Sequence, residues 1–318
     1  MHEALYLLFE KTFYPPDAHA MNRRTFLQTS ALAGVAVALP RLAYGAFRTG
    51  TFTDLRGGVG IYTERGGTIG WFVSDDALVV IDAQYPETAT NCWTGLQERS
   101  SRMIDILVNS HHHGDHTAGN GAFRPHTKQI LAHENVPTLQ QAAAEARGTT
   151  EGQVYADATY SGELSNDLGN ERLTLRNYGA AHTGGDSIIH FEEADIVHMG
   201  DLMFNRMPVF IDLNGGSSTE GWIQTLERAH DFFTDETLFI YGHGNPDYGV
   251  TGGRADLLVA RDYLSGVHDY VAKGIAEGTP VDDLANIEKL PGFPEHYVDT
   301  WKQAVGMNVR AVYQERTM

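Results

Sequence analysis

The chain has 318 residues, 42% of them hydrophobic, which is long enough for one large domain with its own core or two small ones. Its 41 acidic and 23 basic side chains give a formal net charge of −18. A surface of that sign repels nucleic acid and anionic membranes, so we expect neither as a partner. The single cysteine, Cys92, excludes an intramolecular disulfide, and we expect it to be a buried, inert thiol.

The first residues resemble an export signal. Arg23 and Arg24 precede Phe26-Leu27 and a short apolar stretch at residues 31–39, as in bacterial twin-arginine signals. The stretch is too short for a membrane span, which needs about 20 residues. We expect residues 1–46 to be an N-terminal extension with a signal peptide, cleavage near residue 46, passage through the twin-arginine machinery and a periplasmic location. An amphipathic N-terminal helix is the alternative, and Met21 is an alternative start.

Strand patterns dominate the chain up to about residue 110, and helical patterns dominate after residue 243. The runs 68–73 and 77–81 flank Ser74-Asp75-Asp76, which predicts a hairpin. A strand is predicted at 104–109. Further strands are predicted at 173–178, 196–199 and 237–241. Helices are predicted over 88–102, 138–147, a stretch from Ser218 or Thr219 to Phe233, 255–277, 281–288 and 295–314.

A histidine-rich segment follows the strand at 104–109 and is the most informative motif. It places His111, His113, Asp115 and His116 within six residues. Imidazole nitrogens and carboxylates are ligands that zinc and its neighbours prefer. Residues two apart in an extended segment face the same way, so His111 and His113 can grip one ion. The turn at Gly114 can bring the other two to a second ion, whereas His112 alternates away and is left out of the ligand set.

Three further candidate ligands appear downstream, each after the end of a predicted strand. His182 follows the strand at 173–178, Asp201 follows the strand at 196–199, and His243 follows the strand at 237–241. Together with the histidine-rich segment they predict a structured site for two metal ions.

This pattern resembles the metallo-β-lactamase-fold hydrolase superfamily, over roughly residues 55 to 245. The resemblance implies that His111, His113 and His182 hold the first metal. Asp115, His116 and His243 would then hold the second. Asp201 would bridge both, as in glyoxalase II and lactonases, and Asp82 would orient a ligand or its loop; the alternative for Asp82 is a turn residue at a strand end.

The resemblance also implies an α/β fold. We expect a four-layer αββα sandwich over residues 47–250 and a helical C-terminal extension at 251–318 packed on it. The implied cofactors are two Zn²⁺ per chain, with iron as an alternative.

Two such ions can share a water and lower its pKa. Our hypothesis is that the resulting bridging hydroxide attacks a carbonyl carbon of a small ester, lactone, thioester or β-lactam amide. Asp115 would be the catalytic residue that orients the nucleophile and relays its proton. Arg206 is a candidate for pairing with a substrate carboxylate; the alternative is that it is a solvated loop residue.

Two other functions stay open at this point. One is an iron-dependent persulfide dioxygenase, because histidine–carboxylate sites suit iron as well as zinc. Those enzymes commonly use one metal, whereas this chain keeps both halves of the site. The other is a non-catalytic metal-binding accessory protein, which a complete ligand set argues against.

Overall fold

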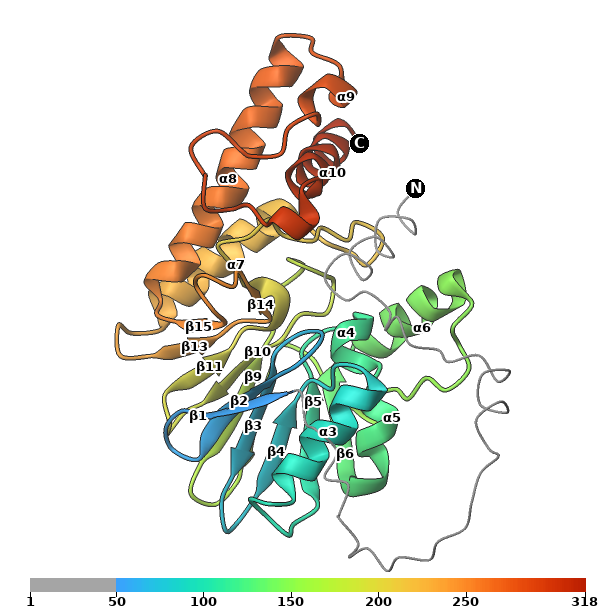
Figure 1. Ribbon diagram of the computed structural model, residues 1–318, viewed down its shortest axis with the longest axis vertical. Coiled ribbons are helices and arrows are strands. Elements are labelled where there is room, and N and C mark those ends of the chain that lie inside the picture. Colours follow the sequence, from blue (N-terminus) through green and yellow to red (C-terminus); the bar gives the residue numbers. More distant parts are fainter. Residues whose placement is uncertain (1–49) are drawn as a thin grey trace, which may run out of the picture. The chain divides into compact units, whose positions relative to one another are not determined.

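A seven-stranded sheet forms the first half of the structure, a computed structural model that describes residues 50–318 (Figure 1). The predicted signal at 1–46 lies outside these residues. The first four strands pair antiparallel and the last four pair parallel. In spatial order they are β1 (Thr51–Asp54), β2 (Val59–Thr63), β3 (Ile69–Val73), β4 (Leu78–Ile81), β5 (Ile104–Asn109), β6 (Thr127–His133) and β7 (Ala158–Tyr160). The predicted hairpin is confirmed as β3–β4.

The second sheet has six strands and is joined by a small ribbon. In spatial order the strands are β15 (Thr251–Gly252), β13 (Leu238–Ile240), β11 (Ile196–His198), β10 (Ile188–Phe191), β9 (Arg172–Arg176) and β8 (Glu163–Asp167). In the ribbon, β12 (Phe204–Asn205) pairs parallel with β14 (His243–Gly244). The ribbon therefore places the chain that follows Asp201 beside His243.

The two sheets face each other across an apolar core. Strand residues that alternate inward from both sheets form one buried cluster. Phe72 from β3 and Phe191 from β10 lie in it, with ring centroids 5.8 Å apart. A second cluster lies between the first sheet and α3 (Pro86–Leu96), and it includes the buried Cys92. Burial raises the pKa of the Cys92 thiol, which keeps it protonated.

Helices cover the outer faces and complete the predicted sandwich. The helices beside the first sheet are α3, α4 (Gly114–Thr117), α5 (Asn120–Phe123), the 3-10 turn η1 (Arg124–His126) and α6 (Val136–Arg147) (Figure 1). Beside the second sheet lies α7 (Thr219–Phe232), whose first turn is capped by Ser218, since its Oγ accepts a hydrogen bond from Gly221 N at 3.2 Å. The four-layer αββα prediction is confirmed.

The C-terminal extension is helical, as predicted. It comprises α8 (Ala255–Ala276), α9 (Val281–Leu284), the 3-10 turn η3 (Asp299–Trp301) and α10 (Ala304–Thr317). α8 packs along α7, and α10 packs along α8. None of the helices between residues 50 and 318 is long and apolar enough to cross a membrane.

Three helices differ from their predicted ranges. The helix predicted over 88–102 begins earlier and ends earlier, at Pro86–Leu96; proline suits the first helical position because its φ is already helical. The predictions 281–288 and 295–314 are too long. The segment between α9 and α10 buries Leu290, His296 and Trp301, whose spacing matches no helical face.

His296 makes the stability of the extension sensitive to acid. Its ring is buried and stacks on Tyr263 with centroids 4.4 Å apart, and neither ring nitrogen hydrogen-bonds to a described residue. Burial lowers its pKa from 6.5 to about 4. Between those values the unfolded chain binds more protons than the folded one, so folding stability falls as the pH falls through this window.

The variant His296→Phe should lose this dependence while keeping the stacked ring. For wild type we expect His296 to contribute about 2 kcal/mol of the stability lost between pH 7.5 and pH 5. Urea unfolding of both proteins at the two pH values measures the difference. An identical loss in wild type and variant would show that His296 is not the responsible group.

Candidate metal centre

The predicted ligands meet at one end of the sandwich. His111 and His113 follow β5, α4 carries Asp115 and His116, and η2 (Gly200–Leu202) carries Asp201 after β11. Figure 1 shows α4 and β14 at the end of the sheets that faces the C-terminal helices. The side chains are all buried: His111, His113, Asp115, His116, His182, Asp201 and His243.

The first group of ligand atoms comprises His111, His113, His182 and Asp201. His113 Nδ1 lies 3.0 Å from His111 Nε2 and 3.0 Å from His182 Nε2. Asp201 Oδ2 lies 3.8 Å from His111 Nε2 and 3.6 Å from His182 Nε2. Ligands bound tetrahedrally at zinc distances lie about 3.3–3.4 Å from one another, which is in the middle of this range.

The second group comprises Asp115, His116 and His243. Asp115 Oδ2 lies 3.1 Å from His243 Nε2 and 3.6 Å from His116 Nε2. Asp201 borders this group too, with Oδ1 3.0 Å from His116 Nε2 and Oδ2 3.3 Å from His243 Nε2. The one carboxylate therefore touches both groups.

The orientation of these atoms fits bound cations better than hydrogen bonds within the protein. Asp115 Oδ2, His116 Nε2 and Asp201 Oδ1 are buried and close to one another, yet none of them has a hydrogen bond of acceptable angle to any residue from 50 to 318. Buried polar atoms without partners are costly, so a cluster of them indicates a ligand. Imidazoles and carboxylates converging in this way can hold metal ions.

Opposing charges dominate the second group. Burial lowers the pKa of His116, but the carboxylates of Asp201, Asp115 and Asp82 raise it well above its usual range. For His243 the same competition between burial and the carboxylates of Asp201 and Asp115 ends at a pKa of about 10. Burial opposes ionisation of Asp201, yet His116 and His243 hold its pKa well below the usual value. Protons on these histidines thus balance carboxylate charge that a bound cation would otherwise balance.

Asp82 lies behind the second group at the end of β4. Its Oδ2 is 2.7 Å from His116 Nδ1 and accepts a hydrogen bond of 2.7 Å from Ser110 Oγ, and its Oδ1 accepts another from Ser110 N at 2.7 Å. Its φ of 65° is a left-handed conformation that aspartate tolerates better than most residues. The contact with Nδ1 turns Nε2 of His116 toward Asp201 and Asp115.

Arg206, the remaining sequence candidate, has partners outside the two groups of ligand atoms. Arg206 Nη1 donates to Asp256 Oδ1 at 2.7 Å and to Asn205 Oδ1 at 2.8 Å, and its guanidinium lies over the Tyr248 ring. Asn205, Asp256 and Tyr248 thus engage the guanidinium, and its pairing with a substrate carboxylate stays a prediction. His112 is buried and lies 3.5 Å from Asp212 Oδ2.

Asp212 is a site residue that the sequence did not indicate. Its Oδ2 lies 3.0 Å from His113 Nε2, the ring nitrogen that points away from the first group. The two residues are 99 positions apart, and Asp212 follows no strand and belongs to no motif. Only the folded chain brings it to the site.

A curated relative matches about half of the chain. It is the 2,4-dinitroanisole O-demethylase subunit alpha of Nocardioides sp. (strain JS1661), which is 28% identical over 177 residues. The match covers 53% of this chain and 50% of the relative, so the chain spans about half the length of that protein.

Solved structures share the fold at low sequence identity. The stereoselective inverting sec-alkylsulfatase Pisa1 from Pseudomonas sp. superposes with a TM-score of 0.63 and 16% identity, over 81% of this chain and 50% of that one. A metallo-beta-lactamase from Pontibacter korlensis superposes with a TM-score of 0.56 and 17% identity, over 68% of this chain and 99% of that one. The family model described as the metallo-beta-lactamase superfamily matches residues 62–244. That range is more than half of the chain and contains both groups of ligand atoms, and the chain therefore belongs to the metallo-β-lactamase superfamily.

Proposed function

We propose that the protein is a hydrolase that uses two zinc ions to cleave a small carbonyl ester, lactone, thioester or β-lactam amide. The observation that carries the proposal is the shared position of Asp201, whose carboxylate borders two buried groups of histidine and aspartate. Two divalent ions held there would supply an activated water and polarise the substrate oxygen.

The protein's own residues would orient this chemistry. Asp82 and Asp212 each contact the far nitrogen of a ligand imidazole, which fixes the direction of its other nitrogen. Phe204 stacks on His243 with ring centroids 5.1 Å apart, and Trp222 packs against His182 at 5.1 Å. These aromatic walls hold the imidazoles in place and exclude water from one side of the centre.

Asp115 is the residue that we propose for proton transfer. It lies in the first turn of the short helix α4, and its buried Oδ2 faces His116 and His243 at 3.6 and 3.1 Å. Burial alone would favour its protonated form, but His116 and His243 keep its pKa below the usual value. An ionised carboxylate in this position can accept the proton of an attacking water and pass it to the leaving group.

The variant Asp115→Asn tests this function. It keeps the shape of the side chain and removes its ability to accept a proton, so we expect kcat to fall at least about 10³-fold at saturating metal. The melting temperature should stay near that of the wild type. Steady-state kinetics on ester, lactone, thioester and β-lactam panels provide the measurement. A fully zinc-loaded wild type that turns over none of these classes would contradict the proposal.

The curated relative favours a second substrate class. Its name assigns it removal of a methyl group from 2,4-dinitroanisole, an activated aryl ether. An aryl methyl ether therefore belongs in the same panel, and release of the phenol without turnover of carbonyl substrates would select this reading. The persulfide dioxygenase alternative instead requires oxygen consumption and about one iron per chain. A non-catalytic metal-binding protein requires that no panel substrate reacts at full metal occupancy.

We also propose export to the periplasm. The support is the pair Arg23-Arg24 ahead of Phe26-Leu27 and the short apolar stretch that follows. Fractionation of cells that express the wild type or a variant with both arginines changed to lysine tests it. Retention of the variant alone in the cytoplasm would support export by the twin-arginine machinery.

A further inference from the structure

The imidazole of His113 is contacted on both of its nitrogens. Nδ1 faces His111 Nε2 and His182 Nε2, each 3.0 Å away, and Nε2 lies 3.0 Å from Asp212 Oδ2. A neutral imidazole has one N–H and one lone pair. The carboxylate can only accept, so it fixes the N–H on Nε2 and leaves the Nδ1 lone pair for the first group of ligand atoms.

Asp212 belongs to a loop at residues 206–218, between β12 and α7, and this loop also holds the flanks of His182. Gly184 N donates to Gly215 O at 2.8 Å. Ser218 N and Ser217 Oγ both donate to Ala181 O, at 2.9 and 2.8 Å. One loop thus contacts His113 directly and brackets His182 on both sides.

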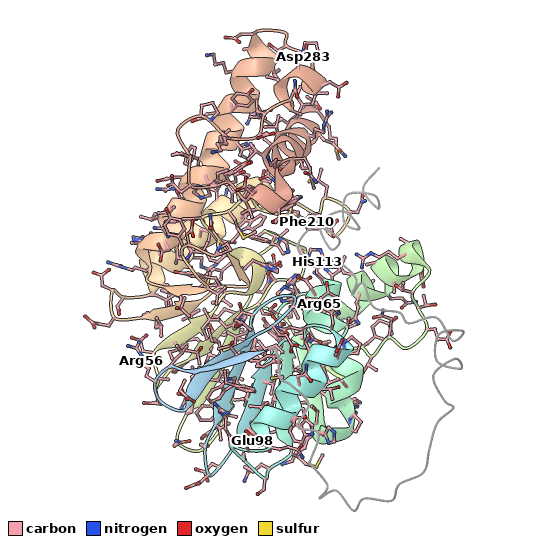
Figure 2. The ribbon with its side chains drawn as sticks, in the orientation of Figure 1. Arg56, Arg65, Glu98, His113, Phe210 and Asp283 are labelled. Atoms are coloured by element: carbon pink, nitrogen blue, oxygen red, sulfur yellow. The ribbon has the colours of Figure 1, made fainter. Side chains whose placement is uncertain are left out.

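The same loop is anchored to the C-terminal helices. Asn308 of α10 donates from Nδ2 to Val209 O at 2.6 Å, and its Oδ1 accepts a hydrogen bond of 2.7 Å from Tyr263 Oη of α8. Asn308 and Tyr263 are both buried. Figure 2 shows Phe210 of this loop between His113 and the C-terminal helices, and its ring lies 5.4 Å from that of His113.

The carboxylate of Asp212 lies between two histidine side chains. Its ion-pair partners among residues 50–318 are His112 and His113. A Cβ at Gly215 would lie 2.3 Å from Asp212 Oδ2 and 2.7 Å from His112 Cε1, so a larger residue here would displace one of these two side chains.

We propose that Asp212 is a positioning residue for His113, and that the C-terminal helices support it through Asn308 and the 206–218 loop. The inference rests on the proposed function, because it assigns His113 to a metal ion. It adds that the C-terminal extension belongs to the metal centre and is more than a cover for the sandwich.

The variant Asp212→Asn tests the role of the carboxylate. Its amide keeps the size of the side chain but is neutral and carries donors, so it no longer fixes the Nε2–H tautomer. Loss of such a partner typically weakens metal binding 10–100-fold, and we expect one of the two zinc sites to lose about that much affinity. Competition titration with a chromophoric zinc chelator measures both sites without any substrate.

The control variant is Asp105→Asn. Asp105 has a side-chain exposure of 18%, close to the 16% of Asp212, but it pairs with Lys128 and lies away from the metal groups. This variant should bind both zinc ions as the wild type does. Unchanged zinc affinity in Asp212→Asn would overturn the inference and leave the proposed hydrolase standing. A wild type that binds two zinc ions but hydrolyses nothing would contradict only the proposed function, and one that binds no zinc would overturn both.

Tyr263→Phe tests the link to the C-terminal helices. It removes the hydroxyl that holds Asn308 and keeps the buried ring, so the fold should persist. We expect it to weaken the same zinc site as Asp212→Asn, by a smaller factor. Zinc affinities equal to those of the wild type would show that the helices do not act on the site.

Discussion

Replacing Asp201 with asparagine is expected to reduce bound zinc from about two ions per chain to one or fewer. The carboxylate lies 3.0–3.8 Å from four histidine nitrogens, which belong to both groups. Asp115, in comparison, lies close to two histidine nitrogens, both in the second group. The amide keeps the shape but removes the negative charge that offsets two cations. In the proposed function both ions act on the reaction, and on that basis we also expect kcat/KM to fall at least about 10³-fold, or about 4 kcal/mol of transition-state stabilisation.

The matched control is Glu171→Gln. Glu171 has the same exposure as Asp201, 3%, and its carboxylate accepts hydrogen bonds from the backbone of residues 172, 193 and 194. The variant Glu171→Gln therefore removes a buried carboxylate charge, as Asp201→Asn does, but at a position outside the two metal groups. Elemental analysis of both variants after equal zinc loading gives the comparison. Two zinc ions in Asp201→Asn would show that the carboxylate does not bridge them.

The convergence of the candidate ligands could be predicted because several of them follow regular strands. His111 and His113 follow β5, and Asp201 follows β11, so an apolar run marks each position in the sequence. Side chains at strand ends meet at one edge of a sheet. Because histidine and aspartate are typical zinc ligands, their meeting there predicts a metal site. The spacing of residues in the sequence does not give distances between side chains. The 3.0 Å contacts of His113 with His111 and His182 are seen only in the structure.

Asp212 could not be predicted for a physical reason. It lies in an irregular loop, and its contact with His113 depends on how that loop is fixed at both ends. No periodicity encodes such a contact. The predicted C-terminal helices were wrong in a similar way between residues 285 and 303, where the chain buries Leu290, His296 and Trp301 and these three positions do not share one helical face. A single sequence carries no pattern that predicts the conformation of a loop held by tertiary contacts.

The family match covers the candidate metal centre but not the helices that support it. Family membership follows from the match over residues 62–244, which contains the ligands. The loop that carries Asp212 lies inside that range, whereas Tyr263 and Asn308, which support it, lie outside. The contacts between the extension and this loop therefore lie partly outside the part of the chain that the family model describes.

Removing the metals is expected to destabilise the protein by a large amount. Without a cation, the carboxylates of Asp115 and Asp201 are balanced only by protons on His116 and His243. An ion present at 1,000 times its dissociation constant stabilises the folded state by about 4.1 kcal/mol. In a domain of this size class each kcal/mol shifts the melting temperature by about 2–4 °C, so one ion corresponds to about 8–16 °C.

The pH dependence of this effect gives a second, independent test. His116 and His243 have raised pKa values in the metal-free protein and must lose protons before they can bind an ion. Acid therefore competes with the metal, and the rise in melting temperature on adding zinc should be smaller at pH 6 than at pH 8. Differential scanning calorimetry of chelated and zinc-refilled protein at both pH values measures it. A zinc-induced shift that is equal at the two pH values would show that metal binding displaces no protons, which is incompatible with ligation by these histidines.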